Sequence, residues 1–373
     1  MLKRLYVDNF RCLSNFELAP APVAALVGPN GGGKSTVFDV LAALQSLLGG
    51  AAIQVGTLFP FLSRTRWNQG LDQTIELEAH EATYGTFRYR LRVHHEASGR
   101  DATLDEELTQ GGDTLYRFSD GEVHLFGDHA SAVPRAKFPA DPRRSFLPIL
   151  EPREDNKRIH AFKNWLASVL LFRLKPDRIP FETEVEHDLL FREGENFVAW
   201  YRSLHQEAPR VTAQILADMK SYVPGLQSMR LERFGPQRRA LAFDTVVAGK
   251  EIPLWLFELS DGQRALLVLY SILRATAQRA TLLLFDEPDN FVALAEIQPW
   301  LVDLRDRVVE AAKGTLLVIS HHPEVIDCLA PDQVLRLWRD EGPTRIRPLD
   351  SDLQLSEGLS ASEVLRIGLA GES

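Results

Sequence analysis

A glycine-rich segment near the amino end of the chain carries the residues with the most recognisable chemistry. Gly28–Thr36 reads GPNGGGKST and fits the pattern G-x-x-x-x-G-K-[ST]. Glycines let backbone N–H groups curl around phosphate oxygens, and a helix that follows adds its positive end. A lysine at the position of Lys34 reaches the β- and γ-phosphates of a nucleotide, and a serine at the position of Ser35 holds Mg²⁺. The segment therefore predicts a nucleotide site rather than a turn with a solvated lysine.

A pair of acids ends an apolar run in the last third of the chain. Thr281–Phe285 is followed directly by Asp286 and Glu287. A buried strand delivers such side chains to the carboxyl edge of a parallel sheet, where open α/β sheets bind ligands. Asp286 suits a Mg²⁺ contact, direct or through water, and Glu287 points elsewhere and could polarise an attacking water. The alternative is an acidic helix start that only complements the helix dipole.

Two further segments have a structural explanation as good as a chemical one. A second apolar run, Thr315–Ile319, ends at Ser320-His321-His322-Pro323. A histidine there can hydrogen-bond a γ-phosphate, although a single His–His–Pro turn is more often a surface turn. Ser260–Gln263 precedes an amphipathic helix and by itself predicts only an N-terminal cap.

The elements around these motifs indicate an α/β fold. Val23–Val27 is a short apolar run, typical of a strand buried on both faces, and Thr36–Leu48 has helical spacing. In the last third, a strand at 281–285, a helix at 295–312 and a strand at 315–320 imply a parallel sheet.

The pattern of apolar and polar residues is different in the middle of the chain. From about residue 74 to 126, apolar and polar residues alternate, which predicts an antiparallel sheet with one solvated face. Residues 131–158 are expected to form an exposed loop, and helical patterns interrupted by prolines follow at 159–171 and 196–219. We therefore expect three sections: 1–130 with the phosphate loop and the antiparallel sheet, 131–240 with an inserted loop and helices, and 241–373 with the remaining motifs.

The order of the motifs resembles that of the ABC-type ATPases, in the branch that contains SMC, Rad50, RecF and OLD-like proteins. The letters GPNGGGKST, LSDGQ, LLLFDEP and SHH follow one another as in that branch, and Leu5–Arg11 is similar to its first strand and Asn-Phe-Arg loop. More narrowly, the chain is similar to stand-alone AAA_21-like, OLD-related ATPases. The resemblance implies a P-loop NTPase fold of the ABC-head type that forms a homodimer around two ATP molecules, with Mg²⁺ as cofactor.

The resemblance also implies a role for each motif residue. Glu287 matches the catalytic glutamate, His321 the switch histidine, and Asn290 lies where the following loop meets the partner. Ser260 and Gly262 match the signature motif, which contacts the ATP of a second copy. Ser35 and Asp286 are the Mg²⁺ residues, and the other expected ATP contacts are Arg11, Asn30, Gly31, Gly32, Gly33, Lys34 and Thr36.

Two departures from the family pattern leave details of the Mg²⁺ and dimer contacts open. Asp289–Leu294 lacks the histidine that the family usually carries after its Asp-Glu-Pro. The glutamine that usually follows the first helix has three candidates here, Gln54, Gln69 and Gln73.

Composition limits the class of protein. The 373 residues carry 42 Lys and Arg against 51 Asp and Glu, a net charge of −9. No apolar run reaches the roughly 18 residues of a membrane span, and the first residues lack a signal-peptide core. Two cysteines, Cys12 and Cys328, make no disulfide framework. We expect a cytoplasmic protein with no membrane partner.

The family's larger appendages are not expected in this chain. The segment between Lys34 and Ser260 lacks the sustained heptads of a coiled-coil arm. OLD nucleases carry a TOPRIM domain after the ATPase, and the segment after His321 is too short for one, so we expect no nuclease.

Two functions stay open on the sequence. Basic residues cluster at 135–158 and 230–239, which predicts a DNA-binding face or, equally, loops kept soluble by charge. The first hypothesis is an ATP hydrolase that serves a DNA-related or phage-defence process. The second is a slow-hydrolysing, ATP-gated module whose dimer holds or releases an effector protein encoded nearby.

Overall fold

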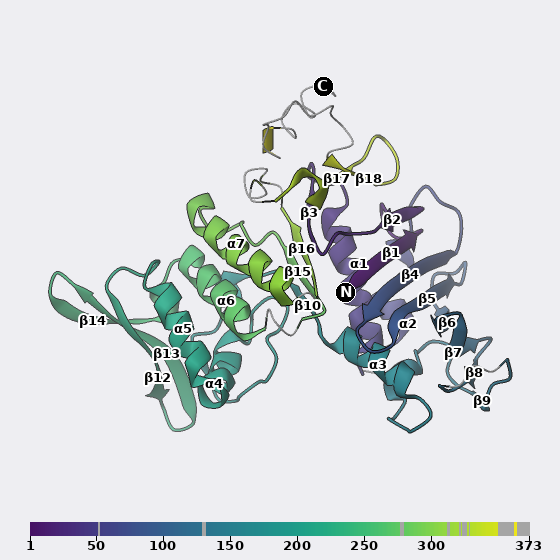
Figure 1. Cartoon of the computed structure of the whole chain (residues 1–373), viewed down its shortest axis with the longest axis horizontal. Coiled ribbons are helices and arrows are strands. Elements are labelled where there is room, and N and C mark those ends of the chain that lie inside the picture. Colours follow the sequence, from purple (N-terminus) through teal and green to yellow (C-terminus); the bar gives the residue numbers. More distant parts are fainter. Residues whose placement is uncertain are drawn as a thin grey trace.

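A six-stranded, mostly parallel sheet forms the central layer of the molecule (Figure 1). The computed structural model describes residues 1–50, 53–128, 132–276, 280–311, 314–320, 322, 327, 329–349 and 362–363. The sheet has the order β10 (Val169–Phe172), β15 (Leu282–Asp286), β16 (Thr315–Ile319), β3 (Val23–Val27), β17 (Val334–Trp338) and β18 (Arg345–Pro348). Only β18 runs antiparallel to its neighbour, so the predicted parallel sheet is confirmed.

Side chains that alternate along each central strand divide the core into two clusters. Leu282 and Leu284 pack into one hydrophobic cluster, and Leu283 and Phe285 pack into the other. The first cluster lies against α1 (Lys34–Leu48) and α3 (Lys157–Ala167), and the second against α4 (Phe197–Glu207), α5 (Pro209–Met219), α6 (Asp261–Ala275) and α7 (Leu294–Ala311). Because both faces are covered, β3, β10, β15 and β16 are apolar along almost their whole length rather than alternating.

An eight-stranded antiparallel sheet forms a second layer, on the α1 side of the central sheet (Figure 1). Its order is β2 (Phe16–Leu18), β1 (Leu2–Asp8), β4 (Asp72–Glu81), β5 (Gly85–His95), β6 (Ala102–Gln110), β7 (Asp113–Ser119), β8 (Glu122–Leu125) and β9 (Ala136–Pro139). Alternate residues are buried, as the sequence predicts.

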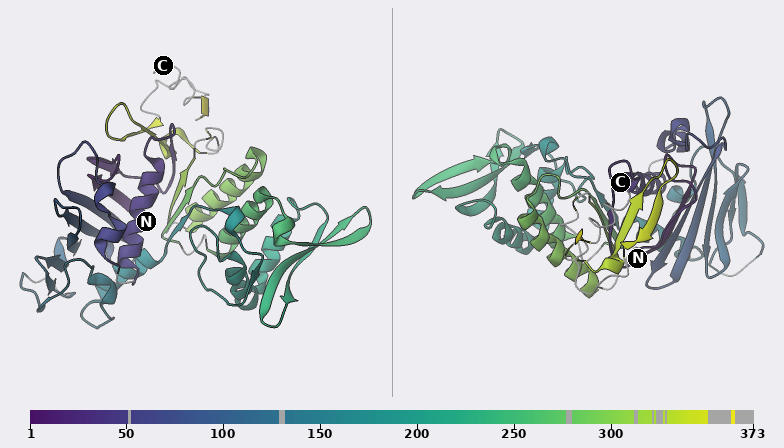
Figure 2. Two further views of the ribbon diagram at one scale, coloured as in Figure 1. Left: turned by 180° about the vertical axis from the view of Figure 1, so that it is seen from behind. Right: turned by 90° about the horizontal axis from the view of Figure 1, so that it is seen from above.

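A smaller sheet, which the sequence analysis did not foresee, extends beyond helices α4 and α5 (Figures 1 and 2). It contains β11 (Glu182–Thr183), β12 (Leu226–Phe234), β13 (Arg238–Val247) and β14 (Lys250–Trp255). The section boundary expected between residues 240 and 241 lies within β13. Short helices complete the described fold: α2 (Val55–Leu58), η1 (Phe61–Ser63), η2 (Leu147–Ile149), η3 (Pro176–Arg178), η4 (Leu256–Glu258) and η6 (Pro331–Gln333).

The expected helix over 159–171 is wrong in its last part. Helix α3 ends at Ala167, and the next apolar residues form β10, an edge strand of the central sheet. Ser168 caps the end of the helix: its backbone N–H makes the last helical bond, to the carbonyl of Asn164, and its hydroxyl lies 2.9 Å from that of Thr281, just before β15. Pairing with β15 thus overrides the helical spacing.

The exposed loop expected over 131–158 is also partly wrong. Ala136–Pro139 pairs with β8 as the edge strand of the antiparallel sheet, and Leu147 is fully buried. By contrast, the second helical pattern is confirmed, with its break at Pro209. None of the helices in the described part of the chain is long and apolar enough to cross a membrane.

Candidate nucleotide site

The phosphate loop joins the end of β3 to the start of α1 in a conformation that requires glycine. Gly28 has φ 144°, and a Cβ there would lie 1.9 Å from the carbonyl oxygen of Leu337 on β17. Gly33 has φ 101°, and a Cβ there would lie 2.4 Å from the hydroxyl of Thr344. The loop curls around a cavity of about 160 Å³ lined by Cys12, Asn30, Gly31, Gly32, Gly33, Lys34, Ser35, Thr36 and Glu287. The structure therefore brings Glu287 together with seven of the expected ATP contacts.

Lys34 lies folded over this loop and is only 5% exposed. Its ammonium donates to the carbonyl oxygens of Gly28, at 2.8 Å, and Pro29, at 3.1 Å. Burial lowers the pKa of Lys34, and the nearby carboxylates, that of Glu287 first, act in the opposite direction. The ammonium is thus a buried donor that a phosphate can engage in place of the two carbonyls.

Ser35 and Asp286 meet at the carboxyl edge of the central sheet, as the Mg²⁺ prediction requires. The Ser35 hydroxyl donates to Oδ1 of Asp286 at 3.3 Å. A hydroxyl and a carboxylate are oxygen donors of the kind that Mg²⁺ prefers, so this pair fits the metal. Among the described residues, no group of three or more His, Cys, Asp or Glu could hold a metal. The remaining ligands of an ion here would come from phosphate and water.

Two residues near this pair were not predicted from the sequence: Arg173, which contacts Asp286, and Asp39, which contacts Arg173. Arg173 follows β10, and its Nε and Nη2 both lie 2.6 Å from Oδ2 of Asp286. Its Nη2 also lies 3.1 Å from Oδ1 of Asp39, on α1. Burial raises the pKa of Asp286, and the guanidinium of Arg173 acts against that shift.

Glu287 has a backbone conformation unusual for a residue with a side chain. Its φ is +53°, and its N–H donates to the carbonyl of Ile319 at 2.8 Å. The side-chain amide of Asn290 donates to Oε2 of Glu287 at 2.8 Å. Strained residues of this kind cluster at functional sites, and here the turn directs Glu287 toward the phosphate-loop cavity.

The Ser260 segment caps helix α6 and does not line the cavity of its own chain. The Ser260 hydroxyl accepts from the N–H of Gln263, as the structural explanation predicts. Ser260 and Asp261 are exposed. A Cβ at Gly262 would lie 2.7 Å from the carbonyl oxygen of Phe291, in the loop after Glu287. The helix start is therefore accessible and packed against the segment that follows the acids.

The remaining predicted contacts do not line the cavity or lie outside the described residues. Arg11 has φ +50°, its guanidinium pairs with Asp39, and it does not line the cavity. His321 lies outside the described residues. Of the glutamine candidates, Gln73 is fully buried and bonded to the carbonyl of Asn9, and Gln69 is exposed.

The two basic clusters are interleaved with carboxylates of the same chain. Arg158 lies 3.0 Å from Asp113, and Arg238 lies 2.6 Å from Glu182. Ion pairs also join Arg135 to Asp155, Arg143 to Asp141, Lys157 to Glu154, and Arg230 to Asp244. Much of the local charge is therefore neutralised internally, which lowers the attraction of these faces for a phosphate backbone.

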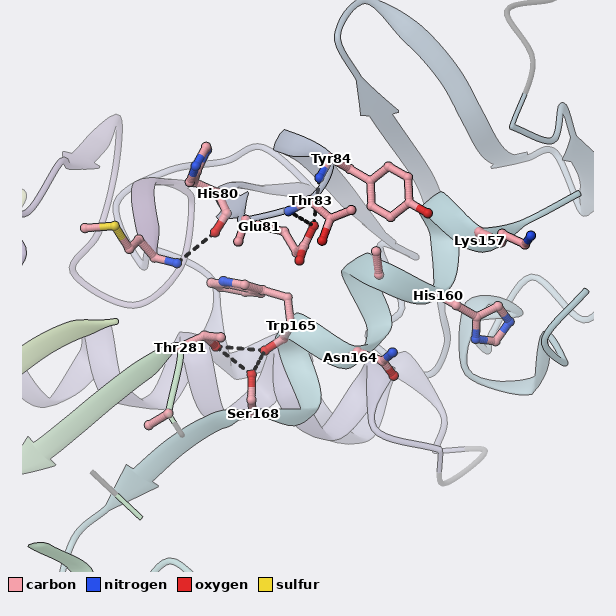
Figure 3. A pocket seen from close by; sticks show the side chains of 14 residues that line it. His80, Glu81, Thr83, Tyr84, Lys157, His160, Asn164, Trp165, Ser168 and Thr281 are labelled. Carbon is pink, nitrogen blue, oxygen red and sulfur yellow. Dashed lines mark hydrogen bonds between the residues drawn. The ribbon is translucent and has the colours of Figure 1, made fainter. Parts of the chain in front are cut away.

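A larger cavity of about 770 Å³ lies at the opposite edge of the central sheet. Figure 3 shows Tyr84 and His80 on one side, His160 and Trp165 of α3 on the other, and Thr281 at one end. Thr281 precedes β15, whose other end carries Asp286. No residue of the four motifs lines this cavity, so we assign the nucleotide to the smaller one.

Comparison with families of known proteins gives one match over most of the chain. A profile of the AAA_21 family, described as "AAA domain, putative AbiEii toxin, Type IV TA system", matches residues 23–327. This range spans the phosphate loop, the Ser260 segment and the acids at 286 and 287. Among individual proteins, the OLD nuclease of Thermus scotoductus is 35% identical over 130 residues, which cover 32% of this chain and 23% of the nuclease.

Solved structures resemble the whole fold. An SMC head bound to the C-winged helix domain of ScpA covers 94% of this chain and 99% of its own, with a TM-score of 0.57 and 14% identity. A second structure is an SMC head with an extended coiled coil, bound to the C-terminal domain of ScpA and derived from Pyrococcus furiosus. It covers 100% of this chain and 99% of its own, again with a TM-score of 0.57 and 14% identity. At this identity the likeness shows the fold alone, and it confirms the predicted ABC-head type of P-loop NTPase.

Proposed function

The chain belongs to the AAA_21 family of ABC-like ATPases related to SMC, Rad50 and OLD proteins, and from this premise we propose that two copies clamp two ATP molecules head to tail and hydrolyse them. The observation that carries the proposal is the meeting of Lys34, Ser35, Asp286 and Glu287 at one edge of the central sheet. Two strands that are distant in the chain, β3 and β15, bring these residues to that edge.

Each side chain has one task in this proposal. Lys34 exchanges its bonds to loop carbonyls for bonds to the β- and γ-phosphates. Ser35 and Asp286 hold Mg²⁺, which when bound neutralises charge on the transferred phosphoryl group. Glu287 accepts a proton from the attacking water, and Asn290 holds its carboxylate in place at 2.8 Å.

The composite character of the site rests on the Ser260 segment. This segment opens a helix of 15 residues, is exposed, and does not line the cavity of its own chain. A helix start with free N–H groups is suited to phosphate oxygens, so the segment is available to the nucleotide of a second copy. Phe291, packed beside Gly262, and Asn290, the residue before it, would face the same partner.

The variant Glu287→Gln tests this proposal. We expect it to bind ATP, to lose hydrolysis by about 10²- to 10⁴-fold, and to accumulate as a dimer when ATP is present. Light scattering after a sizing column, with and without ATP, measures the dimer. Glu251→Gln, an exposed acid on β14, is the matched control and should behave as wild type. A Glu287→Gln protein with the wild-type rate contradicts the role of Glu287, and one that stays monomeric with bound ATP contradicts the clamp.

The second candidate is a slow ATPase that gates an effector protein, and one observation favours it over a DNA-related role. The basic clusters that could contact DNA are largely paired with the chain's own carboxylates. Binding of the neighbouring gene product that changes with ATP would support gating. Hydrolysis stimulated by DNA at physiological salt would favour the first candidate. A cytoplasmic location remains a prediction.

A further inference from the structure

Arg173 directly follows the carboxyl end of β10, at the same edge of the central sheet where Ser35 and Asp286 meet. Strand β10 is parallel to β15, with Phe172 opposite Phe285. The next residue of each strand is therefore Arg173 beside Asp286. The sheet itself places a guanidinium next to the carboxylate expected to bind metal, without any loop in between.

The guanidinium occupies one oxygen of Asp286 and leaves the other to Ser35. Its Nε and Nη2 both lie 2.6 Å from Oδ2. Oδ1 accepts from the Ser35 hydroxyl at 3.3 Å. The side chain of Asp286 is 2% exposed, so water contributes little to its orientation. Two donors on one oxygen and one on the other fix the rotation of the carboxylate.

Arg173 is itself held in place from other sides. Its guanidinium lies over the ring of Phe38, 4.4 Å from the centroid, and 3.1 Å from Oδ1 of Asp39. Its backbone N–H donates to the carbonyl of Arg192 at 2.9 Å. The guanidinium of Arg192 donates to the carbonyl of Ala42 at 3.0 Å. Arg173 is thereby tied to α1, the helix that carries Ser35.

We propose that Arg173 is a positioning residue for the metal: it holds Oδ2 of Asp286 so that Oδ1 faces the Ser35 hydroxyl. This inference rests on the proposed function, because it concerns the metal of bound Mg–nucleotide. Arg173 contacts neither the metal nor the phosphates in this role. It acts through Asp286, as residues behind a metal ligand commonly do.

Metal affinity measured apart from turnover tests this role. Mn²⁺ serves as a paramagnetic probe in place of Mg²⁺, and its binding to the ADP-loaded protein is titrated by electron paramagnetic resonance. Arg173→Ala should weaken Mn²⁺ binding about 10- to 100-fold. ADP affinity measured in EDTA should not change, because Lys34 and the loop still hold the phosphates. Arg173→Lys keeps the charge without the two-pronged geometry, and should recover part of the loss.

Two reference variants complete the experiment. Ser35→Ala removes a predicted metal ligand and should weaken Mn²⁺ in the same way. Arg158→Ala removes an arginine of 12% side-chain exposure whose partner Asp113 lies 3.0 Å away in the antiparallel sheet, and should leave Mn²⁺ affinity at the wild-type value. Thermal unfolding of every variant reports the stability lost with the ion pair.

Each contrary outcome has a distinct meaning. Wild-type Mn²⁺ affinity in Arg173→Ala overturns the inference and leaves a structural ion pair. Tighter binding overturns it too, because the guanidinium would then compete with the metal. If Arg173→Ala does not fold, Arg173→Lys decides, and unchanged affinity in that variant contradicts the inference. A wild-type protein without ADP-dependent Mn²⁺ binding overturns the proposed function as well.

Discussion

The hydroxyl of Ser35 and the carboxylate of Asp286 lie 3.3 Å apart, although 251 positions separate them in the chain. Ser35 lies in the first turn of α1, which follows β3, and Asp286 ends β15; β16 lies between the two strands. The parallel direction of all three strands puts these ends at one edge. The nucleotide site is therefore a product of sheet topology.

Lys34→Ala should remove most of the affinity for ATP. The ammonium is a buried donor within the phosphate loop, and a charge-assisted hydrogen bond to phosphate contributes about 1.5–3 kcal/mol. We expect affinity to fall about 10- to 100-fold in a fluorescent-nucleotide titration. Lys3→Ala, at an exposed position on β1, should bind ATP as wild type does. Unchanged affinity in Lys34→Ala would place the nucleotide elsewhere.

Gly262→Ala should disturb the loop after Glu287 and leave the phosphate loop intact. The added Cβ would lie 2.7 Å from the carbonyl oxygen of Phe291, so that backbone must shift. Overpacking of this kind costs about 1–3 kcal/mol, which thermal unfolding measures. Gly56→Ala is the control, since its Cβ meets Ala102 at an ordinary 3.5 Å. Equal stability of the two variants would contradict this, because it would show that the backbone at Phe291 shifts without a measurable cost in the free energy of unfolding.

His94 should make stability depend on pH. Its ring nitrogens lie 3.0 Å from Asp72 and 3.0 Å from Asp105. Burial lowers the pKa of His94, but the hydrogen bonds to both carboxylates outweigh burial and raise the pKa above 6.5. A raised folded-state pKa stabilises the fold fully below pH 6.5, and this stabilisation is lost as pH rises through the folded value.

Urea unfolding of wild type and His94→Gln at about pH 6 and pH 9 measures this effect. The advantage of wild type should be larger at the lower pH, by no more than about 1 kcal/mol because the pairs are partly exposed. His80→Gln, which loses a bond to the Thr86 hydroxyl in the same sheet, is the control. An advantage that grows toward pH 9 contradicts the assignment.

The sequence predicted those parts of the site that sit in a motif. Lys34 and Ser35 follow a pattern whose spacing depends on backbone geometry, and Asp286 follows a short apolar run. Arg173 also follows a short apolar run, Val169–Phe172. Because the residues before this run have helical spacing, the sequence predicted one continuous helix there instead of a helix and a strand. Only the pairing of β10 with β15 shows that the two charges meet, and such pairing is not local.

The sheet of β11 to β14 was missed for a different reason. Four successive residues of β13, 240–243, are all buried, so the strand lacks a clear alternation. Gly235 and Gly249 mark the two turns of the sheet. Turn glycines spaced in this way are a hairpin signal that the sequence carried. The division of the chain after residue 130 stays a prediction.

A mixture of two inactive variants tests the shared site most directly. Ser260→Arg puts a bulky cation on the exposed start of α6 but leaves the phosphate loop intact, and Lys34→Ala does the reverse. Each protein alone should hydrolyse ATP at a small fraction of the wild-type rate. Mixed in equal amounts, they should recover roughly a quarter of it, because half of the dimers are mixed and each of these holds one complete site. A Ser260→Arg protein that hydrolyses ATP normally as a monomer, or a mixture that regains nothing, would contradict the composite site.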